Sequence, residues 1–376
     1  MFDSFSNQLD DLLQRVGHKL QISKTQRKLA EQRYNSVGIW LSDDQKFFKG
    51  KDVDIYPQGS LSISTTVKPL QQQEYDLDLV CEIKENWQGK DPLELLDSIE
   101  RRLNEHDTYK KMVERKNRCV RLNYANEFHM DILPAHPTDN GNNTNVKVPD
   151  RKAEDWKDSN PKGYAAWLNE RSEQYWNVLL EKKAVASIQP LPIDDDPNRK
   201  PPLKRAVQLI KRYRDIYFED DPDSAPISIV LTTLAGKYYD GQVSVNDAID
   251  VILEKILANI PREGRLIVVN PTNKQEDLSE RWDGKPKLYH SFVSFVRDFK
   301  QHWSELNKIQ GIDEIAKELK VMFGESIINE SLKEQAEFME KARKKQVLGV
   351  VGSSGLLVAA AKEPVIPLRK NTFYGE

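Results

Sequence analysis

Residues 75–81 read Tyr-Asp-Leu-Asp-Leu-Val-Cys and alternate between apolar and acidic side chains with a period of two. This alternation predicts a β-strand, because successive side chains of a strand point to opposite faces of its sheet. Asp76 and Asp78 are two residues apart, so both carboxylates leave the same face. Leu77 points the other way, and we expect it to be buried in the core.

A third acidic residue, Asp131, lies in another apolar run, residues 128–133. An Asp-x-Asp pair alone is a weak signal, since it often faces solvent. The apolar neighbours of Asp76 and Asp78 indicate a buried strand, where carboxylates without a function are costly. If the two strands are neighbours, the three carboxylates repel one another unless a cation neutralises them. The three residues therefore predict a catalytic metal site.

Magnesium is the expected ion, with manganese as an alternative, because both accept oxygen ligands and substrate phosphates. Two such ions would stabilise the attacking and the leaving oxygen of an in-line displacement. In this hypothesis Asp76 and Asp78 hold the ions, and Asp131 positions or deprotonates an acceptor hydroxyl. We expect His129, on the same face, to be structural.

The triplet Gln58-Gly59-Ser60 precedes the Asp-x-Asp strand. We expect it to end one strand and open a turn, where backbone amides and the serine hydroxyl bind the β and γ phosphates of a nucleotide. A Gly-Ser pair has no value as a motif by itself. Its place ahead of the acidic strand makes the combination more specific.

The rest of the chain indicates an α+β protein with two halves. The first half carries helical and strand patterns, which we assign to a helix over 4–42, strands over 55–67, a helix over 92–104, a hairpin of 119–124 with 128–133, a short strand over 146–149, and a helix containing Trp167 and Trp176. A mixed sheet flanked by helices follows from this order.

A segment rich in Asp and Pro, residues 191–202, marks the domain boundary, because neither helix nor central strand tolerates it. Helices are predicted beyond it over 203–217, 227–239, 245–258, 287–308 and 311–323. The domains are therefore 1–190 for the sheet with its long leading helix, 200–345 for a helical domain, and 346–376 for a loose, Gly-rich tail.

Bulk composition narrows the class of protein. The 56 basic and 59 acidic residues leave a net charge of -3, whereas a protein that grips a nucleic-acid duplex usually has a basic excess. Cys81 and Cys119 are expected to be free thiols in a reducing compartment. No run is long enough to span a membrane and the first residues lack a signal-peptide pattern, so a cytoplasmic protein is expected.

The acidic strands and the Gly-Ser turn resemble the DNA polymerase β-like nucleotidyltransferases, and within them the CD-NTases, the cGAS/DncV-like enzymes of bacterial anti-phage signalling (CBASS). The similarity covers residues 58–66, 74–80 and 129–134, and continues in family order through 156–164, 203–215 and 270–282. It implies a nucleotidyltransferase sheet packed on a C-terminal helical domain, with the active site in the cleft between them.

The resemblance also implies further nucleotide-binding residues. Lys211 matches the family lysine that reaches the donor triphosphate, and Ser228 matches the serine that binds the same phosphates. Asn270 is expected near the acceptor nucleotide. Without the resemblance, Lys211 is one more charge in a basic run, although a lysine and a hydroxyl at a helix start suit a polyphosphate.

For partners, the resemblance implies ATP and other nucleoside triphosphates as substrates and a downstream effector that binds the product. A regulatory protein, or one that conjugates the tail, is a further expected partner. Two distant cysteines without nearby histidines form no zinc site, so direct activation by DNA is not expected. A plain disordered end is the simpler interpretation of residues 371–376.

The leading hypothesis is an enzyme that makes a cyclic di- or trinucleotide messenger and releases pyrophosphate with each bond. One alternative is synthesis of linear oligonucleotides or nucleotidylation of RNA or protein. Another is an inactive module that only binds nucleotide. The bases, the linkage and the ring size are not determined by these patterns.

Overall fold

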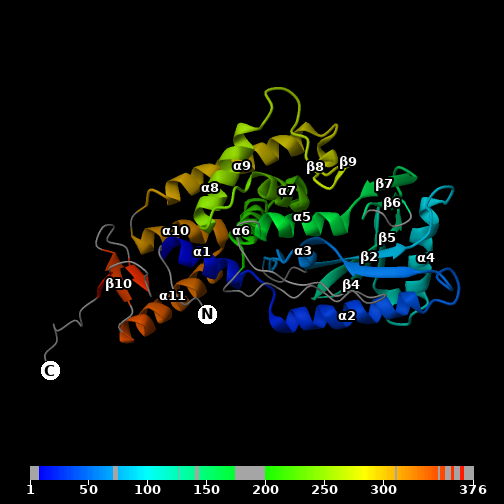
Figure 1. Ribbon diagram of the computed structural model, residues 1–376, viewed down its shortest axis with the longest axis horizontal. Helices are drawn as coiled ribbons and strands as arrows, with labels where there is room; N and C mark the ends of the chain where they lie inside the picture. Colours follow the sequence, from blue (N-terminus) through cyan, green and yellow to red (C-terminus); the bar gives the residue numbers. More distant parts are fainter. Residues whose placement is uncertain are drawn as a thin grey trace.

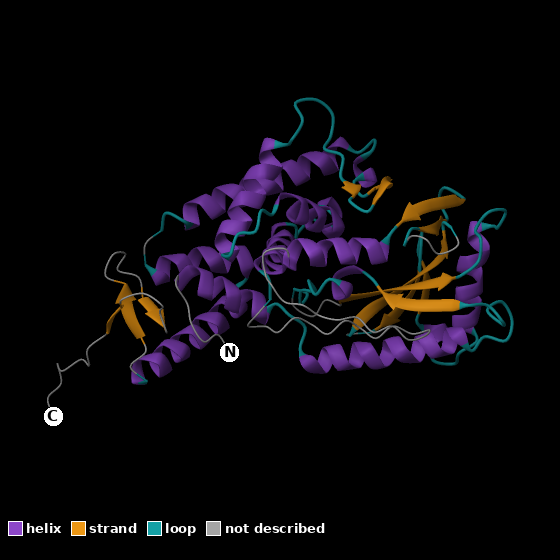
Figure 2. Cartoon of the chain, viewed as in Figure 1, coloured by secondary structure: helices purple, strands orange, loops and turns teal. Residues whose placement is uncertain are grey.

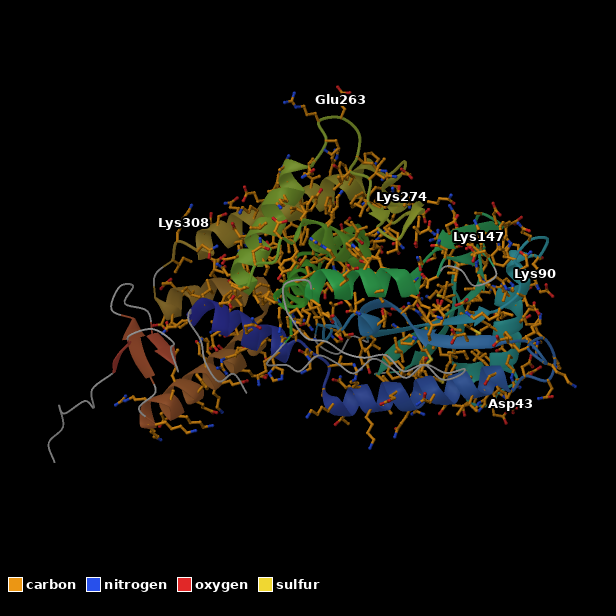
Figure 3. The ribbon with its side chains drawn as sticks, viewed as in Figure 1. Asp43, Lys90, Lys147, Glu263, Lys274 and Lys308 are labelled. Carbon is orange, nitrogen blue, oxygen red and sulfur yellow. The ribbon has the colours of Figure 1, made fainter. Side chains whose placement is uncertain are left out.

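The computed structural model shows a β-sheet at one end of the molecule and a bundle of helices at the other (Figures 1 and 2). It describes residues 8–70, 75–125, 127–139, 144–173, 200–309, 311–345, 348–351, 357–359 and 365–367. Exposed charged side chains such as Asp43, Glu263 and Lys308 lie on the outer surface of both halves (Figure 3). None of the helices in these residues is long and apolar enough to cross a membrane.

The sheet is mixed, as the sequence predicts. Its main strands run in the order β1-β2-β5-β4-β3, where β1 is Val53–Pro57, β2 is Tyr75–Ile83, β3 is Val113–Arg115, β4 is Val120–Tyr124 and β5 is Phe128–Pro137. Strands β2 and β5 are parallel, and the other neighbours are antiparallel. Two further strands, β6 (Val146–Asp150) and β7 (Asp155–Ser159), extend from the end of β5.

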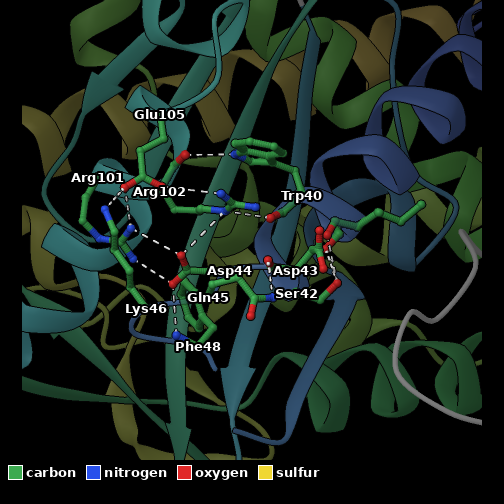
Figure 4. A network of polar contacts seen from close by, with 12 residues as sticks. Trp40, Ser42, Asp43, Asp44, Gln45, Lys46, Phe48, Arg101, Arg102 and Glu105 are labelled. Carbon is green, nitrogen blue, oxygen red and sulfur yellow. Dashed lines mark hydrogen bonds and ion pairs between the residues drawn. The ribbon is translucent and has the colours of Figure 1, made fainter. Parts of the chain in front are cut away.

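One face of the sheet is covered by α2 (Lys24–Ser42) and α4 (Pro92–Asn104). Leu77 of β2 is fully buried against these helices, as expected from its place between two aspartates. Polar contacts fix the two helices to each other (Figure 4): Trp40 and Arg102 exchange bonds with each other's backbone carbonyl, and Arg101 binds Asp44. The opposite face of the sheet is left for Asp76 and Asp78.

The second half of the chain is helical around α6, as predicted. Its helices are α5 (Pro161–Glu173), α6 (Pro202–Tyr217), α7 (Ser228–Tyr238), α8 (Val245–Ala258), α9 (Pro286–Leu306), α10 (Ile312–Phe323) and α11 (Glu325–Lys344). Helix α6 packs against α7, α8 and α10, and twelve of its sixteen residues are buried. A hairpin of β8 (Val269–Asn270) and β9 (Asn273–Asp277) extends from this half toward β7.

The leading segment differs from the expected single helix. It forms α1 (Gln8–Lys19) and α2, and Ser23 caps α2 by accepting from the Gln26 amide. Helix α1 packs on α11, α8 and α6, so it belongs to the helical half and not to the sheet domain of the predicted 1–190. The physical reason is that its apolar stripe, with Leu12 and Val16, has its partners there.

Other expectations need correction or lie outside the described residues. The first strand predicted over 55–67 ends at Pro57, before Gly59 as expected, but Gly59–Ser62 is a short helix, α3, and residues 63–67 form no second strand. The tail expected to be loose contains three short strands that pair with one another: β10 (Leu348–Val351), β11 (Leu357–Ala359) and β12 (Val365–Pro367). Trp176 and the boundary segment 191–199 lie outside the described residues.

Candidate active site

The three predicted aspartates lie on adjacent strands and on one face. Asp78 of β2 is directly opposite Asp131 of β5, and Asp76 is opposite His129. Burial and then the neighbouring Asp76 and Asp131 together raise the pKa of Asp78 to about 8, against the opposing effect of Arg121 and Lys211. Burial also raises the pKa of Asp76, and the neighbouring carboxylate of Asp131 adds a smaller effect in the same direction. The cluster therefore lacks compensating positive charge.

Arg121 of β4 supplies part of that charge. Its guanidinium binds both oxygens of Asp131, at 2.6 and 2.7 Å, and lies 3.5 Å from Asp76. The side chain of Asp131 is only 15% exposed under this contact, whereas that of Asp76 is 59% exposed. With Asp131 engaged in this way, the described side chains contain no group of three acidic, His or Cys residues arranged as metal ligands.

The carboxylate of Asp78 packs against Gly59 at the start of α3. Gly59 has a φ of +64°, and a β-carbon there would lie 2.1 Å from Oδ2 of Asp78. The amide of Gln58 also donates to the Asp78 carbonyl at 2.9 Å. Glycine is required for two reasons, since its backbone is left-handed and any side chain would displace the carboxylate.

Side chains of α6 and of Lys200, just before it, hold the loop that follows α3 by donating to its backbone carbonyls. Lys211 binds the carbonyl and the hydroxyl of Thr65, at 3.2 and 3.0 Å. Gln208 donates to the carbonyl of Thr66, and Lys200 donates to that of Ser64. Burial lowers the pKa of Lys211 to about 7. The helical half thereby sets the position of the loop next to the acidic strands.

These elements enclose a cavity of about 520 Å³ between the sheet and the helical half. It is lined from the sheet half by Gln58, Gly59, Ser60, Asp76, Asp78, Asp158 and Ser159, and from the helical half by Lys211, Arg214, Ser228, Asn270 and Glu276. Lysine, hydroxyls and a helix start at one end suit a polyphosphate, beside carboxylates that suit a divalent cation. Neither Asp131 nor its partner Arg121 is among the lining residues.

Comparisons with known proteins agree with this geometry. Residues 4–172 match the model of the Second Messenger Oligonucleotide or Dinucleotide Synthetase domain. A c-di-GMP synthase of Roseivirga ehrenbergii is 39% identical over 98% of both chains. The chain belongs to the CD-NTase family. It is therefore a nucleotidyltransferase that makes cyclic oligonucleotides.

More distant CD-NTases share the fold. The cyclic dinucleotide synthase CdnG of Bradyrhizobium diazoefficiens is 25% identical over 96% of this chain and 91% of its own. The structure of CdnG in complex with GTP superposes with a TM-score of 0.71 at 23% identity, covering 88% of this chain and 99% of that one. Escherichia coli DncV bound to 3'-deoxy GTP gives a TM-score of 0.58 at 17% identity over 84% and 94%.

The structure places the other residues that the CD-NTase resemblance implies along the same cavity. Ser60 contacts the hydroxyl of Thr66 at 3.1 Å, and Ser228 accepts a hydrogen bond from Arg214. The Asn270 amide donates to Glu276 at 2.7 Å, and its oxygen accepts from Thr272. In this state Ser228 and Asn270 are bound to protein groups, and the role of each toward nucleotide remains a prediction.

Sequence reasoning missed Arg121, Thr65 and Glu276. For Arg121 a signal was available, because a hairpin that pairs Tyr124 with Phe128 also pairs Arg121 with Asp131. Thr65 gave no comparable signal, since its contact with Lys211 joins segments that only the tertiary fold brings together. Glu276 contacts Asn270 within the β8–β9 hairpin, but its contact with Ser159 of β7 likewise depends on the tertiary fold.

Proposed function

We propose that this CD-NTase joins two molecules of GTP into c-di-GMP and uses magnesium to do so. The observation that carries the product is 39% identity to a c-di-GMP synthase across nearly the whole of both chains. The site geometry is compatible, since acidic strands, a glycine-bounded phosphate loop and a buried lysine border one cavity. GTP as the donor replaces the ATP that the family resemblance alone suggests.

The residues of the chain would divide the reaction between them. Gly59, Ser60, Lys211 and Ser228 would hold the triphosphate of the donor. The acceptor hydroxyl oxygen forms a bond to the α-phosphorus, and the bond from that phosphorus to pyrophosphate breaks. The hydroxyl proton passes to Asp131 or to water. A second transfer closes the ring, so two bonds form and two pyrophosphates leave.

The donor set of the acidic cluster fits magnesium. Asp76, Asp78 and Asp131 offer oxygen ligands on one sheet face, and the raised pKa of Asp78 marks negative charge that lacks a partner. When bound, the ions would neutralise the phosphates and stabilise the charge of the leaving pyrophosphate. Asp131 would have to exchange its contacts with Arg121 before it serves either an ion or the hydroxyl.

In the cell, we propose that the product is a second messenger in anti-phage (CBASS) defence and that a separate effector protein binds it in the cytoplasm. A regulatory partner is a further proposal, supported by the solved complex of Escherichia coli CdnC with a HORMA protein. That complex shows the fold of a relative only, since it is 14% identical to this chain.

Labelled nucleotides test the proposed function directly. Purified protein with magnesium is incubated with GTP, with ATP and with both, and the products are treated with phosphatase and exonuclease. We expect GTP alone to yield a resistant product with the mass of c-di-GMP, and Asp78→Asn to yield none. A linear product, or a cyclic product without guanine, would refute the proposal.

A further inference from the structure

A carboxylate at the end of the cavity formed by β7, β8 and β9 has no role in the chemistry above. Glu276 of β9 lines the cavity and accepts hydrogen bonds at both oxygens. Ser159 of β7 donates to Oε1 at 3.1 Å, and Asn270 of β8 donates to Oε2 at 2.7 Å. Three strands from both halves of the molecule therefore hold this carboxylate in one orientation.

The charge environment sets Glu276 apart from the other acids of the cavity. Asp158 is paired with Lys147 at 2.9 Å, and Asp215 is paired with Arg214. Among the described cavity residues outside the Asp76–Asp78 pair, Glu276 is the acid whose side-chain partners are neutral donors and not a cation. Burial raises the pKa of Glu276. Arg118, which also lines the cavity, offsets this charge only in part and forms no ion pair with Glu276. A buried carboxylate that is compensated only in part is costly unless a bound molecule uses it.

The hydrogen bonds that Glu276 can still accept indicate which donor groups that molecule must carry. A carboxylate has about four lone-pair sites, and Ser159, Asn270 and the backbone amide of Asn160 donate to Glu276, which leaves it able to accept from a bound molecule. Guanine presents two adjacent N–H donors on its Watson–Crick edge, at N1 and the exocyclic N2. Adenine presents an acceptor at N1, which an anion repels. A site of this kind strongly rejects the base that leaves its buried polar groups unpaired.

We propose that Glu276 selects guanine, by accepting hydrogen bonds from N1–H and the N2 amino group of a base bound at this end of the cavity. The inference rests on the proposed use of GTP and extends it to a named specificity residue. Asn270 then acts through Glu276, by holding its carboxylate toward the base. This assigns Asn270 a positioning role, in place of the direct nucleotide contact that the family resemblance implies.

Glu276→Gln tests the proposal, because an amide both donates and accepts and so complements the edge of adenine. Binding of non-hydrolysable GTP and ATP analogues is measured by calorimetry, and the bases in the product are identified by mass. We expect the preference for GTP over ATP to fall by about 10- to 100-fold, the range of one or two base-specific hydrogen bonds, and adenine to enter the product. Glu254→Gln is the matched control, since Glu254 is exposed on α8 and does not line the cavity.

The outcomes separate the two proposals. Wild-type protein that makes no c-di-GMP from GTP refutes the proposed function before any variant is tested. Wild type that makes it, with a folded Glu276→Gln whose GTP preference matches wild type, overturns the role of Glu276 alone. If Glu276→Gln does not fold, Glu276→Asp decides: a weaker GTP preference without gain of ATP supports the role, and an unchanged preference overturns it.

Discussion

Replacing Gly59 by alanine tests the contact on which the acidic cluster depends. The backbone of Gly59 is left-handed, with a φ of +64°. An alanine in that conformation costs roughly 1–2 kcal/mol of folding free energy. Its β-carbon would also lie 2.1 Å from Oδ2 of Asp78, a distance that no real contact allows. Either the carboxylate or the start of α3 must move by about 1 Å or more.

The two costs can be measured separately, because the chain contains a matched glycine. Gly89 has a φ of +74°, and a β-carbon there meets nothing within 4 Å. Gly89→Ala therefore reports the backbone cost without the clash. We expect Gly89→Ala to lose about 1–2 kcal/mol in urea unfolding and Gly59→Ala to lose at least as much, because its clash adds to the backbone cost. Only Gly59→Ala should lose activity, by about 100-fold, since a misplacement of about 1 Å at a reacting centre costs that much.

Initial rates of pyrophosphate release from GTP with magnesium, measured at a temperature where both variants are folded, provide the assay. If Gly59→Ala keeps a rate within a few-fold of Gly89→Ala, the packing of Gly59 against Asp78 does not position the carboxylate for catalysis. Equal losses of activity in both variants would mean that general destabilisation explains the effect.

Three further predictions concern the charges of the cleft. Arg121→Gln removes the cation that binds Asp131, so the melting temperature in EDTA should fall. Magnesium should then raise the melting temperature of the variant by more than it raises that of the wild type. An equal rise in both proteins would contradict this. Lys211 has a pKa near 7 because of burial, and a bound polyphosphate raises it, so calorimetry in two buffers should detect proton uptake on GTP binding at pH 8 and none at pH 6. Lys211→Arg stays charged and should show no uptake. The pKa of Asp78 is raised to about 8, so ionisation of Asp78 opposes folding, and the free energy of unfolding of the metal-free protein should fall as pH rises from about 4 to 8. In urea unfolding, Asp78→Asn should show a weaker dependence on pH. The same dependence in the variant and the wild type would contradict this role of Asp78.

Local signals predicted most of the fold. Helix α4 begins after Asp91, whose side chain accepts from the Leu93 amide, and α8 begins after Ser244, which caps it in the same way. Such caps depend on a few consecutive residues, so the predicted ranges 92–104 and 245–258 match the observed helices. The period-two alternation of residues 75–81 likewise located β2 and put both aspartates on one face.

The errors occurred where a local signal was overlooked or a contact was not local. Ser23 and Gln26 form a capping box, which marks the start of a new helix, yet the apolar spacing was extended across it. The short helix at Gly59–Ser62 replaced the predicted turn, and the strand expected after it did not form. Thr65, Thr66 and Lys68 instead bind groups on α6 and just after α1. β-branched residues at 63–67 favour a strand, and these contacts override that preference.

The same loop explains why the site needs both halves of the chain. The amide of Lys68 donates to the Leu20 carbonyl, while Gln208 and Lys211 bind the carbonyls of Thr66 and Thr65. The loop that we propose to bind phosphate is thus fixed to α6 and to the end of α1, and the carboxylates that we propose to bind metal are fixed to the sheet. Gly59 joins the two sides, because it begins the loop and also packs on Asp78. A displacement of the helical half would therefore move this loop relative to the carboxylates without any change in the sheet.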